Sequence, residues 1–146
     1  MLKGLDRALS AELLHVLMLM GHGDDILVCD VNHPAASIAK HTVHGQIVNM
    51  PGCDIPRALE AILSIMPLDT FVPMPVKRMK VVGDPERLMP VHERVQAVAD
   101  RAEERPIAFE ALERFDFYEA ARECFAVVRT SDPGPYGCFI LRKGVV

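Results

Sequence analysis

The stretch that decides the fold is Gly21-His22-Gly23-Asp24-Asp25-Ile26-Leu27-Val28-Cys29-Asp30, a polar, glycine-containing turn followed by four apolar residues. Four consecutive apolar residues bounded by turn residues are typical of a strand buried on both faces, as in a sheet covered by helices. We therefore predict a central strand over residues 26–29 that ends at Asp30. The fold class that this stretch favours is a layered α/β domain.

A helix is predicted immediately before this turn, over residues 11–20. Ser10 has the side chain of an N-cap, and Glu12 is favourably placed in the first turn. Apolar residues recur at helical spacing at Leu13, Leu14, Leu17 and Met20. Gly21 is predicted to end the helix as a left-handed C-cap.

Helices and strands are expected to alternate along the rest of the chain. Asp54 is predicted to cap a helix with Pro56 in its first turn, and Gly83-Asp84-Pro85 to start another that runs to about residue 102. The remaining expected elements are strands at 76–82, 108–114, 126–129 and 137–143 and a helix at 115–125. No repeat or linker divides the chain, so residues 1–146 are predicted to form a single domain.

Composition limits the classes of function. The net charge is −4 and no cluster of lysine and arginine is present, which argues against nucleic-acid binding. No apolar run approaches the ~18 residues of a membrane span and the N-terminal residues lack the pattern of a signal peptide, so we expect no membrane association and a cytoplasmic location. A 50% hydrophobic content in 146 residues leaves apolar surface for contacts between subunits.

Four cysteines (Cys29, Cys53, Cys124 and Cys138) are present without a CxxC pair. They are predicted to be free, buried thiols rather than a zinc or redox site.

His22 is the first candidate for chemistry. Its flanking glycines allow a ligand to approach closely, and imidazole exchanges protons near neutral pH. The pattern equally fits a histidine that stabilises a helix C-terminus. Asp30 follows the buried strand, where α/β proteins often bind ligands. Because the strand spans about 13 Å, His22 and Asp30 are expected at its opposite ends, meeting only if loops fold back or across a subunit boundary.

A second candidate group lies near the C-terminus. Arg114 and Tyr136 carry planar hydrogen-bonding groups that suit sugar hydroxyls. From the pattern alone a surface ion pair is favoured for Arg114, and core packing for Phe115, Phe117 and Tyr118.

The remaining histidines give weaker signals. His41 and His44 are spaced i, i+3 but lack a third ligand at a recognised zinc spacing. His15 and His92 lie on predicted helices and are expected at the surface or half-buried.

Taken together, these segments resemble the L-fucose mutarotase and D-ribose pyranase family. The resemblance rests on residues 1–3, 10–14, 20–26, Asp30, 114–119, 136–137 and 141–145. The segment Arg114-Phe115-Asp116-Phe117-Tyr118-Glu119 is more similar to the fucose branch than to the ribose branch. The resemblance implies a single-domain three-layer α/β/α sandwich, ring-like homodecamers with sites near subunit boundaries, and no metal or other cofactor.

The resemblance also implies roles for individual residues. His22 would be the proton donor, and Asp30, Arg114, Tyr136, Gly137 and Cys138 would bind the sugar. Tyr118 is a lesser candidate for proton relay, and His33 for a place beside the site. Cys138 stands where the family usually has asparagine, and a thiol donates and accepts hydrogen bonds only weakly.

The expected activity is the interconversion of the α and β anomers of a free monosaccharide, L-fucose or a similar sugar, by acid–base ring opening. Two other functions remain open at this point. One is a non-catalytic monosaccharide-binding accessory protein of a transport or utilisation operon, which would use the same pocket. The other is a metal hydrolase built on His33, His41 and His44.

Overall fold

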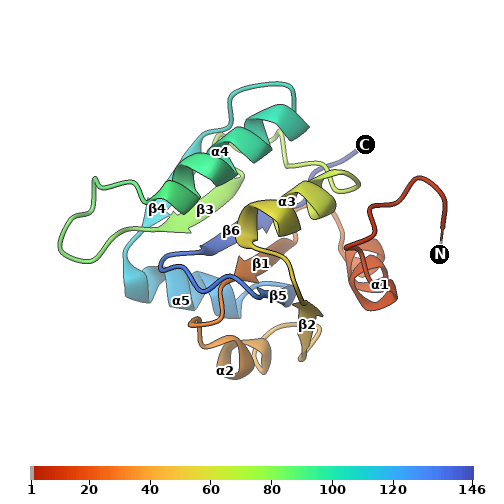
Figure 1. The fold of residues 1–146 in the computed structure, drawn as a ribbon, viewed down its shortest axis with the longest axis horizontal. Coiled ribbons are helices and arrows are strands. Elements are labelled where there is room, and N and C mark those ends of the chain that lie inside the picture. The colour runs from red at the N-terminus through yellow and green to blue at the C-terminus, as the bar shows by residue number, and fades with distance from the viewer. Residues whose placement is uncertain (1) are drawn as a thin grey trace.

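A computed structural model describes residues 2–146; Met1, where the resemblance begins, lies outside the described residues. The described chain folds into one six-stranded sheet and five helices (Figure 1). The helices are α1 (Ala11–Leu19), α2 (Ala35–Ala39), α3 (Ile55–Leu63), α4 (Pro90–Ala102) and α5 (Arg114–Arg122). The strands are β1 (Asp25–Cys29), β2 (Ile47–Met50), β3 (Val76–Met79), β4 (Phe109–Leu112), β5 (Ala126–Thr130) and β6 (Cys138–Arg142).

Strand β1 occupies the interior of the sheet, whose order is β2-β5-β1-β6-β3-β4. It pairs with β5 in parallel and with β6 antiparallel, and the side chains of Ile26, Leu27, Val28 and Cys29 are fully buried. The predicted central strand is confirmed. Strand β6 runs against all the others, so the carboxyl ends of β1 and β3 meet the amino end of β6 at one edge of the sheet.

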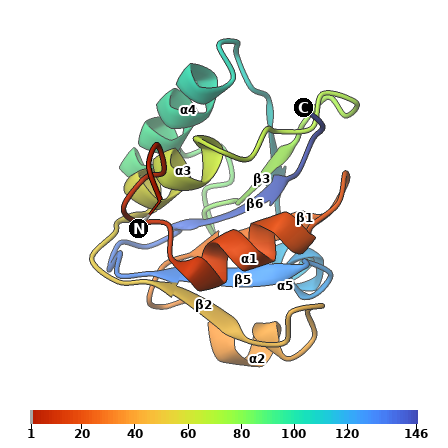
Figure 2. The same cartoon turned by 90° about the vertical axis from the view of Figure 1, so that its right-hand side faces the viewer.

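Helices cover both faces of the sheet (Figure 2). Helices α1, α3 and α4 pack on one face around Leu13, Leu59 and Val95, and α2 and α5 pack on the other around Ile38 and Phe117. The three-layer α/β/α sandwich is therefore confirmed. None of the helices in residues 2–146 is long and apolar enough to cross a bilayer.

Two predicted helix starts are confirmed by their caps. Ser10 Oγ accepts a hydrogen bond from the Leu13 amide (3.1 Å) at the start of α1. Asp54 Oδ1 accepts one from the Arg57 amide (2.9 Å) at the start of α3, with Pro56 in the first turn. Each cap satisfies an amide that has no partner inside its helix.

The predicted end of α1 is wrong in detail. The helix stops at Leu19, Met20 is extended, and the left-handed conformation belongs to Gly23 (φ 85°) rather than Gly21. The helix needs no glycine cap because the Lys143 ammonium donates to the carbonyl oxygens of Leu17 (2.8 Å) and Met20 (2.6 Å). A cation far along the chain, directly after β6, thus satisfies the helix C-terminus.

Other boundaries also differ from the prediction. The helix expected from residue 84 begins at Pro90, because residues 83–89 form turns in which Gly83 has φ 81°. The strand expected over 76–82 ends at Met79. Helix α2 and strand β2 were not predicted, since each is only four or five residues long.

Candidate functional site

A cavity of about 310 Å³ lies at the edge of the sheet where β1 and β3 end and β6 begins. It collects six of the predicted site residues in its wall: Asp30, His33, Arg114, Tyr118, Tyr136 and Cys138. Met79 and Val82, which were not predicted, line the same cavity from the end of β3. The carboxyl ends of parallel strands are where α/β proteins most often bind ligands.

Asp30 ties together the loops that form this cavity. Its Oδ1 accepts hydrogen bonds from the amides of Asn32 (2.8 Å) and His33 (3.0 Å), and its Oδ2 accepts one from the Gly137 amide (3.0 Å). Burial raises the pKa of Asp30 above its usual value, while the three amides act in the opposite direction. The carboxyl group therefore fixes the loop backbones as well as lining the cavity.

Gly137 allows this close approach. A Cβ at this position would lie 3.1 Å from Ile55 Cγ1 and 3.2 Å from Asp30 Cβ, tighter than ordinary packing permits. Gly137 thus contributes its backbone amide to Asp30 and is not itself part of the cavity wall described above.

Tyr136 adopts the left-handed conformation (φ 60°), which is unusual for a residue with a side chain. Its hydroxyl oxygen accepts a hydrogen bond from the Val82 amide (3.0 Å). The hydroxyl proton remains free to be donated to a ligand in the cavity.

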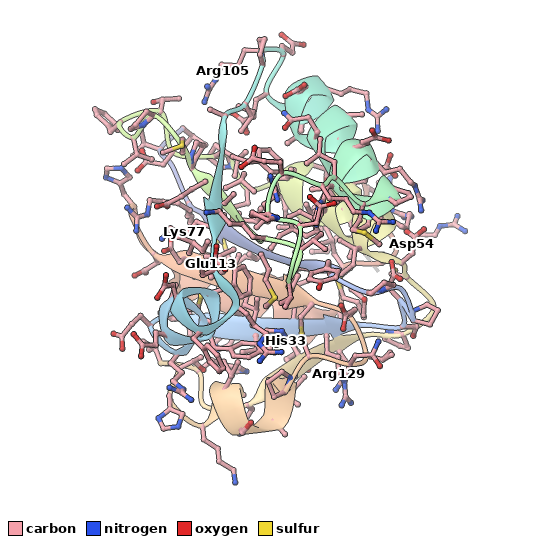
Figure 3. The ribbon with its side chains drawn as sticks, turned by 90° about the vertical axis from the view of Figure 1, so that its left-hand side faces the viewer. His33, Asp54, Lys77, Arg105, Glu113 and Arg129 are labelled. Atoms are coloured by element: carbon pink, nitrogen blue, oxygen red, sulfur yellow. The ribbon has the colours of Figure 1, made fainter. Side chains whose placement is uncertain are left out.

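His33 lies beside α5 (Figure 3) and is buried. Its ring meets Phe117 (6.0 Å between centroids) and Tyr118 (5.4 Å) edge to face. Burial lowers the pKa of His33 to about 4, so the ring is neutral at pH 7. Its Nε2 has no hydrogen-bond partner among residues 2–146.

Helix α5 brings Arg114 and Tyr118 to the cavity. Within residues 2–146 Arg114 makes no ion pair, contrary to the pattern-based expectation, and its guanidinium lies 4.8 Å from the centre of the Phe115 ring. Phe117 is buried as predicted, but Phe115 is 69% exposed, so its predicted core packing is wrong. The two rings differ because Phe117 is on the helix face that packs on the sheet, whereas Phe115 faces outward.

Cys138 contributes a buried thiol to the cavity floor. It lies directly opposite Cys29 in the register of β1 and β6. Burial raises the pKa of Cys138 well above its usual value and that of Cys29 to about 12, so both thiols are protonated at pH 7. Cys53 and Cys124 are also free and buried, so the prediction for all four cysteines is confirmed.

His22 is not part of this cavity. It lies at the amino end of β1, in the turn before Asp25, whereas the cavity is at the carboxyl end. His22 Nε2 is 3.1 Å from Asp69 Oδ1, and the imidazole packs 5.1 Å from the Phe71 ring. The His22 side chain is 45% exposed, while that of Asp69 is 3% exposed.

Asp69 was missed by the sequence analysis. Its Oδ1 accepts a hydrogen bond from the Phe71 amide (2.9 Å), which is the main reason that its pKa is lowered; His22 acts in the same direction. The Asp69 amide donates to the Arg142 carbonyl (3.0 Å) at the end of β6, which places the carboxylate beside His22. An isolated aspartate in a proline-rich segment carried no pattern that could have revealed this contact.

The histidines of the metal alternative do not come together. His33 lies at the cavity and His44 is 3.9 Å from Glu12 Oε1 near α1. Across residues 2–146 no three His, Cys, Asp or Glu side chains group together in a way that suits a metal ion.

Comparisons of the whole chain with known proteins agree on one family. Residues 3–146 match the model of the RbsD / FucU transport protein family. The fucose mutarotase of Homo sapiens is 44% identical over 99% of this chain and 94% of its own length. The L-fucose mutarotase of Glaesserella parasuis is 39% identical over 99% and 96%. The crystal structure of the fucose mutarotase from Streptococcus pneumoniae in complex with L-fucose is 34% identical, covers 99% of both chains and superposes with a TM-score of 0.89.

Proposed function

The chain belongs to the RbsD / FucU transport protein family, and from this premise we propose that it is a fucose mutarotase that interconverts the α and β anomers of L-fucose. The observation that carries the proposal is the cavity at the end of β1, which gathers the proposed sugar-binding groups from three separate segments of the chain. Residues 1–146 would act as one mutarotase domain.

The reaction requires the cyclic hemiacetal to open and close again. A proton leaves the anomeric hydroxyl, another reaches the ring oxygen, and the C1–O5 bond breaks to give the open aldehyde. Rotation about the C1–C2 bond and reclosure on the other face give the opposite anomer. This chemistry needs only groups that donate and accept protons near neutral pH, so we propose no cofactor.

The cavity supplies the binding groups. Arg114 and Tyr136 would donate hydrogen bonds to sugar hydroxyls. Asp30 would orient the sugar through the loops that its carboxyl group holds. Cys138 would contact the sugar where β6 begins, and Gly137 would support sugar binding through the hydrogen bond from its backbone amide to Asp30. Tyr118 and the neutral His33 ring stand beside these groups, where Tyr118 could relay a proton.

His22 would act as the proton donor for the cavity of a neighbouring subunit. Within one chain β1 separates it from Asp30, its ring is half exposed, and Asp69 is placed to orient it. The ring packs on Phe71, and α1, which ends just before His22, carries Met18 and Leu19; all three apolar side chains are more than half exposed. A subunit boundary would cover them and deliver His22 to the site, and we propose the homodecameric ring implied by the family resemblance.

We also propose a cytoplasmic location. The four cysteines are free thiols, which is typical of proteins in a reducing compartment.

Saturation-transfer NMR tests the activity. Exchange between the anomers of L-fucose, D-ribose and D-galactose is measured with and without the protein. We expect acceleration for L-fucose. If L-fucose binds but its anomers exchange no faster, the protein is not a mutarotase, and the function that remains is that of a non-catalytic sugar-binding accessory protein.

A mixing experiment tests the shared site. His22→Ala and Arg114→Ala subunits, each inactive alone, are co-expressed and the mixed oligomer is assayed. Activity should return in part, because some boundaries pair an intact His22 with an intact cavity. If the mixture stays inactive while the wild type is active, the proposal that two subunits share one site is wrong, but the proposed mutarotase activity stands.

A further inference from the structure

A second cavity, of about 380 Å³, lies on the opposite face of the sheet from the candidate site. Its wall is formed by α4, by the residues just before that helix and by the strands β3 and β4. The two strands lie side by side (Figure 1). Arg78 points to this cavity from β3, whereas its neighbour Met79 lines the first one. The mutarotase proposal makes no use of this second cavity, whose size is within the range of small-molecule sites.

Arg78 places at the cavity a charged guanidinium group, one of whose nitrogen donors makes no hydrogen bond. Its Nη1 is buried from solvent and has no hydrogen-bond partner among residues 2–146. A guanidinium remains charged at every physiological pH, so it cannot avoid the cost of burial by losing a proton. A buried, charged donor without an acceptor is rare in proteins, because leaving it unpaired costs free energy.

His92 supplies a second donor from the first turn of α4. It is 3% exposed, contrary to the prediction of a surface or half-buried position, because its ring packs edge to face on Phe139 (5.9 Å between centroids). Its Nδ1 accepts a hydrogen bond from the Met89 amide (3.2 Å), which leaves the proton on Nε2. Nε2 is buried and has no partner in hydrogen-bonding geometry within residues 2–146, although the Tyr136 backbone lies near the ring.

The rest of the wall offers little to pair with these donors. The Gln96 side-chain nitrogen is already held by Asp100 Oδ1 and the Ile107 carbonyl (2.8 Å each). Glu93 lies at the exposed side of the cavity and makes no ion pair with Arg78 in the described part of the chain. Leu88 and Phe109 provide apolar walls.

We propose that this cavity binds a small oxyanion, a phosphate or carboxylate group, through Arg78 and the Nε2–H of His92. The planar guanidinium matches the two oxygens of such a group, and the imidazole N–H adds a third hydrogen bond. Glu93 weakens the interaction by like charge and thereby limits the affinity for highly charged ligands.

The test is an NMR titration of the intact protein with inorganic phosphate and, separately, with acetate, following the side-chain N–H signals of Arg78 and His92. We expect saturable shifts of both signals, and the tighter of the two ions identifies the preferred oxyanion. Arg78→Met should weaken binding at least about tenfold, since it removes the charge-assisted hydrogen bonds. Glu93→Gln should strengthen it.

Arg105→Met is the matched control, because Arg105 is an exposed arginine at the far end of the molecule (Figure 3). It should bind the ions as the wild type does. Thermal unfolding of each variant shows whether it is folded. If Arg78→Met is not folded, Arg78→Lys takes its place in the comparison. Absence of saturable shifts with both ions, or equal affinity in the Arg78 and Arg105 variants, would overturn the proposal. Anomer exchange should be unchanged in all these variants, so the outcome is independent of the mutarotase assay.

Discussion

The two ends of β1 are built in opposite ways. At the carboxyl end, Asp30 is 4% exposed and its carboxyl group is held by three backbone amides around a formed cavity. At the amino end, His22 is half exposed, has one side-chain hydrogen-bond partner, and packs on the exposed ring of Phe71. The first end is a finished binding pocket. The second end carries an exposed imidazole which, in the function proposed above, would complete the site of a neighbouring subunit, so that one chain would carry two different halves of a site.

The largest effect that separates the two ends is expected from His22→Ala. Anomer exchange should fall about 10²- to 10⁴-fold, which is the usual contribution of a general acid–base group. Binding of L-fucose, measured by calorimetry, should persist because the cavity lies at the other end of β1.

Tyr136→Phe provides the matched contrast, because it removes a hydroxyl at the cavity and leaves His22 in place. We expect weaker sugar binding from this variant. If His22→Ala abolishes binding and Tyr136→Phe does not weaken it, the division between the two ends is wrong.

A second prediction concerns pH and the buried end. Burial lowers the pKa of His33 and of His92 to about 4, so both rings stay neutral in the folded protein while the unfolded chain takes up protons near pH 6.5. The free energy of unfolding should therefore be greatest above about pH 6.5 and fall as the pH is lowered toward 4, by up to about 3 kcal/mol for each ring. Asp30, whose pKa burial raises, opposes this trend at the acid end.

Urea denaturation at pH 7, 5.5 and 4.5, at one protein concentration, measures this dependence. His33→Gln should flatten the curve, because the ring responsible for part of the slope is gone. A free energy of unfolding that does not change over this range would contradict the assignment of both rings as buried and neutral.

The cavity end was largely predictable from the sequence, and the His22 end only in part. The apolar run before Asp30 defines a buried strand, and the carboxyl end of such a strand is a general place for ligands. The roles proposed for Arg114 and Tyr136 came from the family resemblance: both side chains suit sugar hydroxyls, but the pattern at Arg114 alone favoured a surface ion pair. Asp69 and Met79 could not be predicted, since their positions depend on how β6 and β3 pair and not on any local spacing.

A third prediction tests Asp69 as the positioning residue for His22. Asp69→Asn keeps the shape but replaces a carboxylate by a neutral amide, so the hydrogen bond to the imidazole loses its charge. We expect kcat for anomer exchange to fall about tenfold, in line with the loss of a charge-assisted hydrogen bond. KM for L-fucose should stay unchanged because Asp69 is remote from the cavity. A rise in KM without a fall in kcat would place Asp69 in sugar binding instead.

The smallest effect is expected at Cys138, and it sharpens the picture of the cavity end. The thiol is protonated, buried against Cys29 and able to form only weak hydrogen bonds. Cys138→Asn introduces an amide that donates and accepts, so we expect KM for L-fucose to fall severalfold, equivalent to about 1 kcal/mol, with kcat unchanged. Anomer-exchange rates across a range of sugar concentrations measure both constants, and Cys138→Ser controls for the loss of sulfur. Unchanged KM values for L-fucose and D-galactose in the folded variant would mean that this position meets the sugar through its backbone alone, and that the thiol does not set the choice of sugar.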